Sequence, residues 1–147
     1  SQDDPDRHEL LWTNRQEELF HTWRELCGER SVRHGVCAKR NKWRHRIISL
    51  CMILIPTCLS GITQVYSPPM LITFGFITNG ILSGIQALFN FGGLYVLHNE
   101  FSAKYEDFKR EMDTELIKPK SLRIACDVYL KSCEMELNAL TRQAPDL

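Results

Sequence analysis

Residues 47–97 read IISLCMILIPTCLSGITQVYSPPMLITFGFITNGILSGIQALFNFGGLYVL and contain no Asp, Glu, Lys or Arg. A helix needs about 20 mostly apolar residues to cross the hydrocarbon core of a bilayer. This stretch is long enough for two such helices, and Ser67-Pro68-Pro69 interrupts it. A soluble domain of 147 residues has too little other sequence to cover an apolar element of this length. The stretch therefore predicts two membrane crossings joined by a tight turn.

The regions on either side of this stretch are polar and nearly neutral. Residues 1–46 carry eight acids and ten Lys or Arg, and residues 98–147 carry ten acids and eight Lys or Arg. This balance is not that of a basic nucleic-acid-binding domain, so we expect no nucleic acid partner. We divide the chain into 1–46 (an amphipathic helix and a basic membrane-boundary segment), 47–97 (a transmembrane hairpin) and 98–147 (a helical region). The predicted fold is all-α, a membrane helical hairpin with a cytoplasmic three-helix bundle.

The bundle is predicted from apolar side chains that recur every three or four residues in three polar segments. They are Trp12, Leu19, Phe20, Trp23, Leu26 and Cys27 in the first, Phe101, Tyr105, Phe108, Met112 and Leu116 in the second, and Leu122, Cys126, Tyr129, Cys133, Leu137 and Leu140 in the third. Asp6 is the expected cap of the first helix, and Pro119 ends the second. These apolar stripes either pack against one another or leave one stripe for a neighbouring subunit.

A basic segment, residues 39–46 with the sequence KRNKWRHR, lies directly before the apolar stretch. Basic residues beside a crossing keep that flank on the cytoplasmic side, and tryptophan prefers the level of the lipid headgroups. We assign five residues to the membrane boundary: Lys42, Trp43, Arg44, Arg46 and, beyond the second crossing, His98. Because two crossings return the chain to its starting side, both termini are expected to be cytoplasmic.

The second crossing is expected to begin at Met70, emerge near residues 89–95 and continue as a helix into the cytoplasm. It carries a polar stripe at steps of four, three and four residues, formed by Asn79, Ser83, Gln86 and Asn90. Beside this stripe lies a small-residue face formed by Gly80, Gly84 and Ala87, which lets another helix approach closely. The stripe either joins helices within one chain, joins separate copies, or lines a water-filled pore.

The depth of each residue in the hairpin separates these possibilities in part. Folding the chain about Pro68 sets Thr57 level with Asn79, so Asn79 is expected to find its partner within the hairpin. The same fold sets Leu50 level with Gln86, so Gln86 is expected to lack a polar partner in its own chain. A buried amide needs a hydrogen-bond partner, which favours contact of Gln86 with another copy or with water.

No pattern in the sequence indicates catalysis or metal binding. We find no Ser/His/Asp order, phosphate-binding glycine loop or HExxH motif, and the cysteines and histidines lack the short spacings of a zinc site. The six cysteines, at positions 27, 37, 51, 58, 126 and 133, are expected to be reduced thiols. We therefore expect a non-enzymatic protein without catalytic, cofactor-binding or metal residues.

The order of these features resembles that of the SLATT group of two-membrane-helix proteins. The similar elements are Leu59-Ser60-Gly61 in the first crossing, the run GIQALFNF at residues 84–91 in the second, His98, and the run YEDFKREMDTEL at residues 105–116. The resemblance covers roughly residues 12–145. Bacterial members of this group are regarded as membrane effectors in conflict systems that act by forming pores, and related proteins occur in large DNA viruses.

The resemblance and the polar stripe together lead to two hypotheses. The first is an oligomeric pore or channel-type effector that self-associates in a cellular membrane. The second is a structural membrane anchor, for example a minor virion component that links an internal membrane to a protein shell. The expected partners are the lipid bilayer, further copies of the chain, and a soluble shell or effector partner on the cytoplasmic side.

Overall fold

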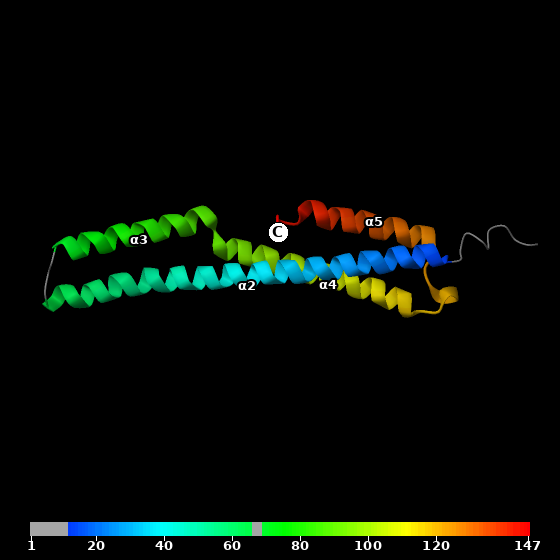
Figure 1. Ribbon diagram of the computed structural model, residues 1–147, viewed down its shortest axis with the longest axis horizontal. Helices are drawn as coiled ribbons and strands as arrows, with labels where there is room; N and C mark the ends of the chain where they lie inside the picture. Colours follow the sequence, from blue (N-terminus) through cyan, green and yellow to red (C-terminus); the bar gives the residue numbers. More distant parts are fainter. Residues whose placement is uncertain (1–11, 66–68) are drawn as a thin grey trace, which may run out of the picture. The chain divides into compact units, whose positions relative to one another are not determined.

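The computed structural model describes residues 12–65 and 69–147, and these residues are helical throughout their regular structure (Figure 1). The elements are α2 (Asn14–Val65), α3 (Pro69–Phe89), α4 (Phe91–Ile117), the short 3-10 helix η1 (Lys120–Leu122) and α5 (Cys126–Gln143). No strand occurs in the two described ranges. The all-α prediction is confirmed.

Helix α2 begins with a reciprocal cap. The Gln16 amide donates to Thr13 Oγ1 at 3.3 Å, and the Thr13 amide donates to Gln16 Oε1 at 2.9 Å. This exchange gives the backbone amides of both residues a hydrogen-bond acceptor at the first turn of the helix. Asp6, the cap expected from the sequence, lies outside the described residues. The helix then runs through the whole basic segment and through Pro56 without ending.

The contacts divide the chain into two compact units. Unit 1 contains Ser1–Val36 and His98–Leu147, and unit 2 contains Cys37–Leu97. Helices α2 and α4 contribute residues to both units. The division on the N-terminal side falls before the basic segment, which therefore belongs to unit 2.

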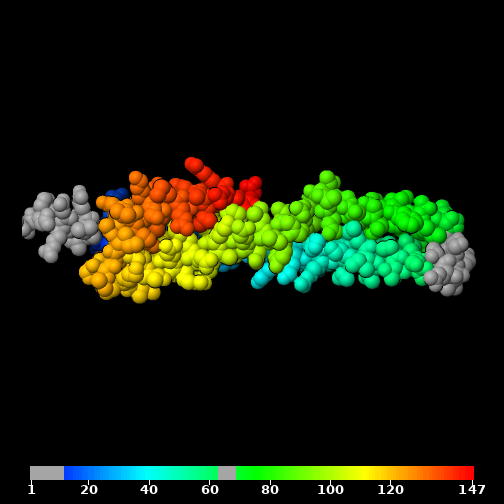
Figure 2. Space-filling view, turned by 180° about the vertical axis from the view of Figure 1, so that it is seen from behind, coloured from blue at the N-terminus to red at the C-terminus, as the bar shows by residue number. Residues whose placement is uncertain are grey.

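Unit 1 has one apolar core to which α2, α4 and α5 all contribute. Its buried members are Trp12, Phe20, Cys27, Phe101, Tyr105, Phe108, Met112, Cys126, Tyr129, Cys133, Leu137 and Leu140. Figure 2 shows α5 lying along α4 within this unit. Most residues of the three predicted apolar stripes are therefore core residues, as their spacing indicates.

Two members of the predicted stripes lie outside this core. Leu19 is exposed beside the buried Phe20, because adjacent positions on a helix point about 100° apart. Leu122 is 71% exposed, and the third helix begins only at Cys126. The residues before it form η1, so the prediction that Leu122 begins the last apolar stripe was wrong.

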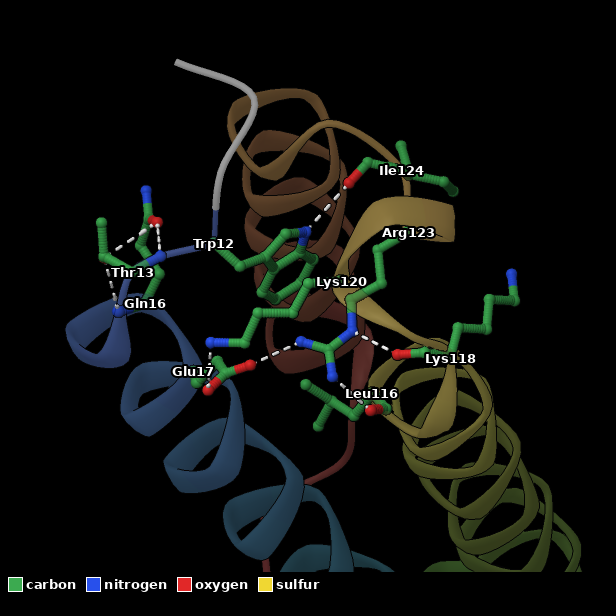
Figure 3. Close-up of polar contacts among 9 residues, drawn as sticks. All are labelled: Trp12, Thr13, Gln16, Glu17, Leu116, Lys118, Lys120, Arg123 and Ile124. Carbon is green, nitrogen blue, oxygen red and sulfur yellow. Dashed lines mark hydrogen bonds and ion pairs between the residues drawn. The ribbon is translucent and has the colours of Figure 1, made fainter. Parts of the chain in front are cut away.

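Arg123 makes several polar contacts that hold the start of α2 to the segment after α4 (Figure 3). Its guanidinium donates to Glu17 Oε1 at 2.6 Å, to the Leu116 carbonyl at 2.6 Å and to the Lys118 carbonyl at 2.8 Å. It also lies 5.1 Å from the centre of the Trp12 ring, whose indole N–H donates to the Ile124 carbonyl at 3.1 Å. One buried side chain thus joins the start of α2 to the segment between α4 and α5.

Unit 2 is a helical hairpin in which α3 lies alongside the later half of α2 (Figures 1 and 2). Two helices of the described chain are long and apolar enough, by length and composition, to cross a membrane. Their most apolar windows are 0% and 6% buried. The apolar side chains of the hairpin therefore point mostly outward, unlike those of a core helix in a soluble protein.

A helix follows the second predicted crossing directly, as expected, but a break at one residue separates the two helices. Helix α3 ends at Phe89, and α4 begins at Phe91 after a break at Asn90. Asn90 has a φ of 40°, in the left-handed region that asparagine adopts more readily than most residues. Its side-chain Oδ1 accepts the amide hydrogen of Gly93 at 3.2 Å and so caps α4.

Candidate functional site

The candidate site is the polar stripe of α3, and its four members differ in how deeply they are buried. Asn79 and Gln86 are half-buried toward α2, whereas Ser83 and Asn90 are exposed. Asn90 caps α4, as described above. The stripe is therefore not one continuous polar surface.

Gln86 meets polar groups of α2 within its own hairpin. Its Nε2 donates to His45 Nδ1 at 3.2 Å and approaches Ser49 Oγ at 3.5 Å. Because the amide nitrogen can only donate, His45 Nδ1 is the acceptor and this imidazole carries its hydrogen on Nε2. The expectation that Gln86 lacks a partner in its own chain was wrong. Its Oε1 atom is buried and has no partner among the described residues.

Asn79 lacks the hydrogen-bond partner that was expected for it. Its Oδ1 is buried without a partner in the described ranges, and Thr57, the expected partner, donates to the Ile53 carbonyl of its own helix at 2.7 Å. Asn79 lines a cavity of about 370 Å³ between the two helices of the hairpin. The other lining residues are Pro56, Leu59, Ser60, Ile72, Gly75 and Phe76. The expectation that Thr57 satisfies Asn79 was wrong.

The side chains that meet in the hairpin differ from those that depth alone suggests. The sequence set Leu50 opposite Gln86, whereas the structure places His45 and Ser49 against its amide nitrogen. Adjacent positions on a helix point about 100° apart, so a nearly correct depth does not identify which side chains meet. The two helices approach closely at Gly75, where an added Cβ would overlap Leu59 Cδ1. Sequence reasoning missed Gly75.

The small-residue face of α3 is open. Gly80, Gly84 and Ala87 are exposed, and a Cβ added at either glycine would meet nothing within 4 Å. Ser83 is exposed as well, and it lies beside this face because it precedes Gly84 and stands three and four residues from Gly80 and Ala87. The hairpin itself does not use this face, so its predicted role in packing against another copy stays a prediction.

The residues assigned to the membrane boundary differ in their surroundings. Lys42 Nζ lies 5.1 Å from the centre of the Tyr95 ring, and Arg44 Cζ lies 5.9 Å from that of Phe91. Trp43 is 67% exposed, and Arg46 is also exposed. Lys42 and Arg44 thus lie against the start of α4, and the assignment of these four residues to the membrane boundary stays a prediction.

His98, the fifth boundary residue, is buried in unit 1 and only 4% exposed. Its Nδ1 lies 2.9 Å from Nδ1 of His34, which is 1% exposed and stacks on the Tyr105 ring. One nitrogen must donate and the other accept, so the pair holds one shared hydrogen between the two rings. Burial, the neighbouring His98 and the Arg30 guanidinium lower the pKa of His34. Sequence reasoning missed this pair because 64 residues separate its members.

Two thiols of unit 1, Cys27 and Cys133, are buried in its core. Burial raises the pKa of Cys27 and of Cys133 to about 11, so both remain protonated thiols at neutral pH. All six cysteines are free. The described residues contain no group of three or more His, Cys, Asp or Glu side chains placed to hold a metal ion.

Comparison of the chain with known protein families, curated proteins and solved structures finds no match. The resemblance to the SLATT group therefore stays an expectation from the sequence. The function has to be inferred from the polar stripe, the open small-residue face and the outward-facing apolar side chains.

Proposed function

We propose that the chain is a non-enzymatic, two-pass membrane protein that self-associates in the bilayer through α3 and forms a pore. The observation that carries this proposal is the open small-residue face of Gly80, Gly84 and Ala87, with Ser83 beside it, on a helix whose other outward side chains are large and apolar. Examples are Phe74, Ile77, Ile81 and Leu88, all of them exposed.

The arrangement of α3 supports this proposal because lipid and protein favour different helix surfaces. Large apolar side chains pack well against lipid tails, whereas small residues let two backbones approach closely and gain contacts that lipid does not provide. Steps of three and four residues keep Gly80, Ser83, Gly84 and Ala87 on one side of the helix. A copy seated there brings the Ser83 hydroxyls of neighbouring chains together.

The buried amide oxygens of Asn79 and Gln86 add a second reason for assembly. Both are without a partner in the described residues, and an unsatisfied polar atom in hydrocarbon costs several kcal/mol at the upper end of measured values. Water in a pore between copies, or a donor from the next copy, would satisfy them. Neutral hydroxyl and amide groups would give a pore of weak ion selectivity.

Self-association is tested by native mass spectrometry of the full chain in detergent and nanodiscs. Replacing Gly80 and Gly84 by leucine is expected to reduce the assembly to monomers, because the added side chains hold the backbones apart. The matched control is Gly61→Leu on α2, where a Cβ also meets nothing within 4 Å. An oligomer that survives G80L/G84L, or is equally lost in G61L, contradicts the proposed face.

Pore formation is tested separately, by ion flux from liposomes that contain the protein. We expect flux from the unaltered chain and less flux from Ser83→Ala, which removes the hydroxyl but stays small and so leaves the oligomer number unchanged. If the oligomer forms and no flux is seen, the protein is not a pore. That result would not contradict the proposed membrane insertion.

A structural membrane anchor is the second candidate, and exposed apolar side chains on unit 1 favour it. Ile117, Leu122 and Val128 are all exposed around η1 and the start of α5, where a soluble shell or effector partner could bind. Cross-linking in the native membrane or particle separates the candidates. Contacts between copies alone would exclude the anchor, and cross-links from Val128 to a different protein would support it.

A further inference from the structure

The basic segment, residues 39–46, concentrates the positive charge of unit 2 next to its apolar hairpin. From Cys37 to Leu97 the chain contains five Lys or Arg, all within residues 39–46, and no Asp or Glu. In the described residues none of the five forms an ion pair with an acid, although several cations of unit 1 do. A positive charge of five units is thus concentrated at one level of the hairpin and left without a counter-charge.

The helix places these cations on two sides of α2. Lys39, Lys42 and Arg46 follow at steps of three and four residues and share one side. Arg40 and Arg44 are four residues apart and share another, and the exposed Trp43 lies between the two sides. Cations on both sides of one tryptophan form a collar around the outward half of the helix.

Two of the cations are held in place by aromatic rings of α4. Lys42 lies over Tyr95 and Arg44 over Phe91, each within about 6 Å of the ring centre, the range of a cation–π contact. Tyr95 and Phe91 are four residues apart and therefore share a side of α4. The ring contacts leave both charges unneutralised, so they restrict where the cations lie without removing their need for an anion.

From these observations we propose that the collar binds the headgroups of anionic phospholipids, which it selects over zwitterionic ones. This inference rests on the proposed membrane insertion of the hairpin. Charge complementarity identifies the ligand, because a phosphate-bearing headgroup supplies the acids that unit 2 lacks. The exposed Trp43 adds a side chain that prefers the headgroup level.

The depth of the collar agrees with such a ligand. It directly precedes the charge-free stretch that begins at Ile47, so cations and hydrocarbon-facing side chains are neighbours along α2. A lipid bound here can place its headgroup at the collar and its acyl chains along exposed residues such as Leu50 and Ile53. A soluble anion would gain only the first of these two contacts.

The test is lipid retention by the full chain, released from nanodiscs that contain phosphatidylcholine and phosphatidylglycerol and measured by native mass spectrometry. We expect phosphatidylglycerol to be enriched over its share in the disc. Replacing Lys39, Lys42 and Arg46 by glutamine should abolish this enrichment. Each cation removed is expected to lower the affinity for phosphatidylglycerol about fivefold. The matched control replaces three exposed cations of unit 1, Arg15, Lys131 and Arg142.

The outcomes are distinguishable. Equal retention of both lipids by the unaltered chain, or an equal loss in the unit 1 control, overturns the proposal. Inorganic phosphate that displaces phosphatidylglycerol at matched concentration would also overturn it, because the site would then bind phosphate and not a lipid. A chain that fails to enter discs of pure phosphatidylcholine would overturn the proposed membrane insertion instead.

Discussion

At the scale of single residues, a few buried polar side chains decide how unit 1 is held together. Arg123 joins Glu17 to the carbonyls of Leu116 and Lys118, and it stacks on Trp12. The partnership lowers the pKa of Glu17, mainly through its hydrogen bond with Arg123. Breaking these contacts costs more than breaking an exposed ion pair, because the Arg123 side chain is only 9% exposed and two backbone carbonyls lose its hydrogen bonds, although Glu17 keeps its pair with Lys120.

We predict that Arg123→Met lowers the free energy of unfolding of unit 1 by about 2 to 4 kcal/mol. The methionine keeps the packing of the side chain and removes all three hydrogen bonds. Chemical unfolding followed by near-UV circular dichroism of the buried aromatic side chains measures this loss. Arg110→Met is the control, since Arg110 and Asp107 form a mostly exposed pair worth about 0.5 kcal/mol or less. Equal effects of the two changes would contradict the role of Arg123.

The His34–His98 pair predicts a pH dependence of the same unit. His98 and Tyr105 of α4 and Arg30 of its own helix lie beside His34, and Glu29, Arg33 and Asp146 line the same pocket. The pKa of His34 is lowered from its ordinary value of 6.5, so below that pH the unfolded chain binds a proton more readily than the folded one. The free energy of unfolding is therefore expected to fall as the pH drops below about 6.5. The fall ends once the pH is below the pKa of His34 in the folded chain.

Thermal unfolding across this pH range tests the prediction. His34→Gln should flatten the dependence just below pH 6.5, and His21→Gln, at an exposed position, should leave it unchanged. Glu17 and Glu115 have lowered pKa values, so their contributions are lost only at lower pH, below 4.5. An unaltered slope in His34→Gln would show that the pair is not its source.

At the scale of the elements, the break between α3 and α4 depends on Asn90. Its φ of 40° and its bond to the Gly93 amide together end one helix and begin the next. We predict that Asn90→Val lowers the stability of unit 2 by about 1 to 2 kcal/mol, because a β-branched residue resists a positive φ and cannot cap. Asn90→Gly, which accepts the backbone angle, should cost less.

The measurement is thermal unfolding in detergent, with the two Asn90 variants compared directly. Gly93→Ala provides a further check, since its added Cβ would lie 2.4 Å from Asn90 Nδ2 and displace the cap. If valine and glycine at position 90 are equally stable, the break does not depend on the backbone angle of Asn90.

Much of the fold could be predicted from the spacing of apolar residues, and the reasons for the failures are physical. A three- and four-residue period identified buried side chains such as Phe20, Tyr105 and Cys133, because each helix buries one face. The depth of Gln86 in the hairpin was also predictable, whereas its partners were not. The partners depend on how each helix is rotated about its axis, and the apolar pattern does not reveal close approaches such as that of Gly75 to Leu59.

At the scale of the whole molecule, the two units differ in what they expose. Unit 1 buries a mixed apolar core under a charged surface, and unit 2 exposes apolar side chains and carries cations without any acid. A bilayer satisfies the second pattern, since its hydrocarbon covers the apolar side chains and its headgroups meet the cations. We therefore propose that unit 2 crosses the membrane twice and leaves both polar ends of the chain on one side.

Site-specific labelling during insertion into microsomes tests this claim most directly. One cysteine at a time is introduced at Val32 or Val128, which are exposed in unit 1, or at Pro68 between the crossings. Cys37, Cys51 and Cys58 are replaced by serine, and the three buried cysteines are kept. A membrane-impermeant maleimide added outside is expected to label positions 32 and 128, and to label position 68 only after the membrane is opened. Labelling of all three positions in sealed microsomes, or of only one of positions 32 and 128, would contradict the two-pass hairpin.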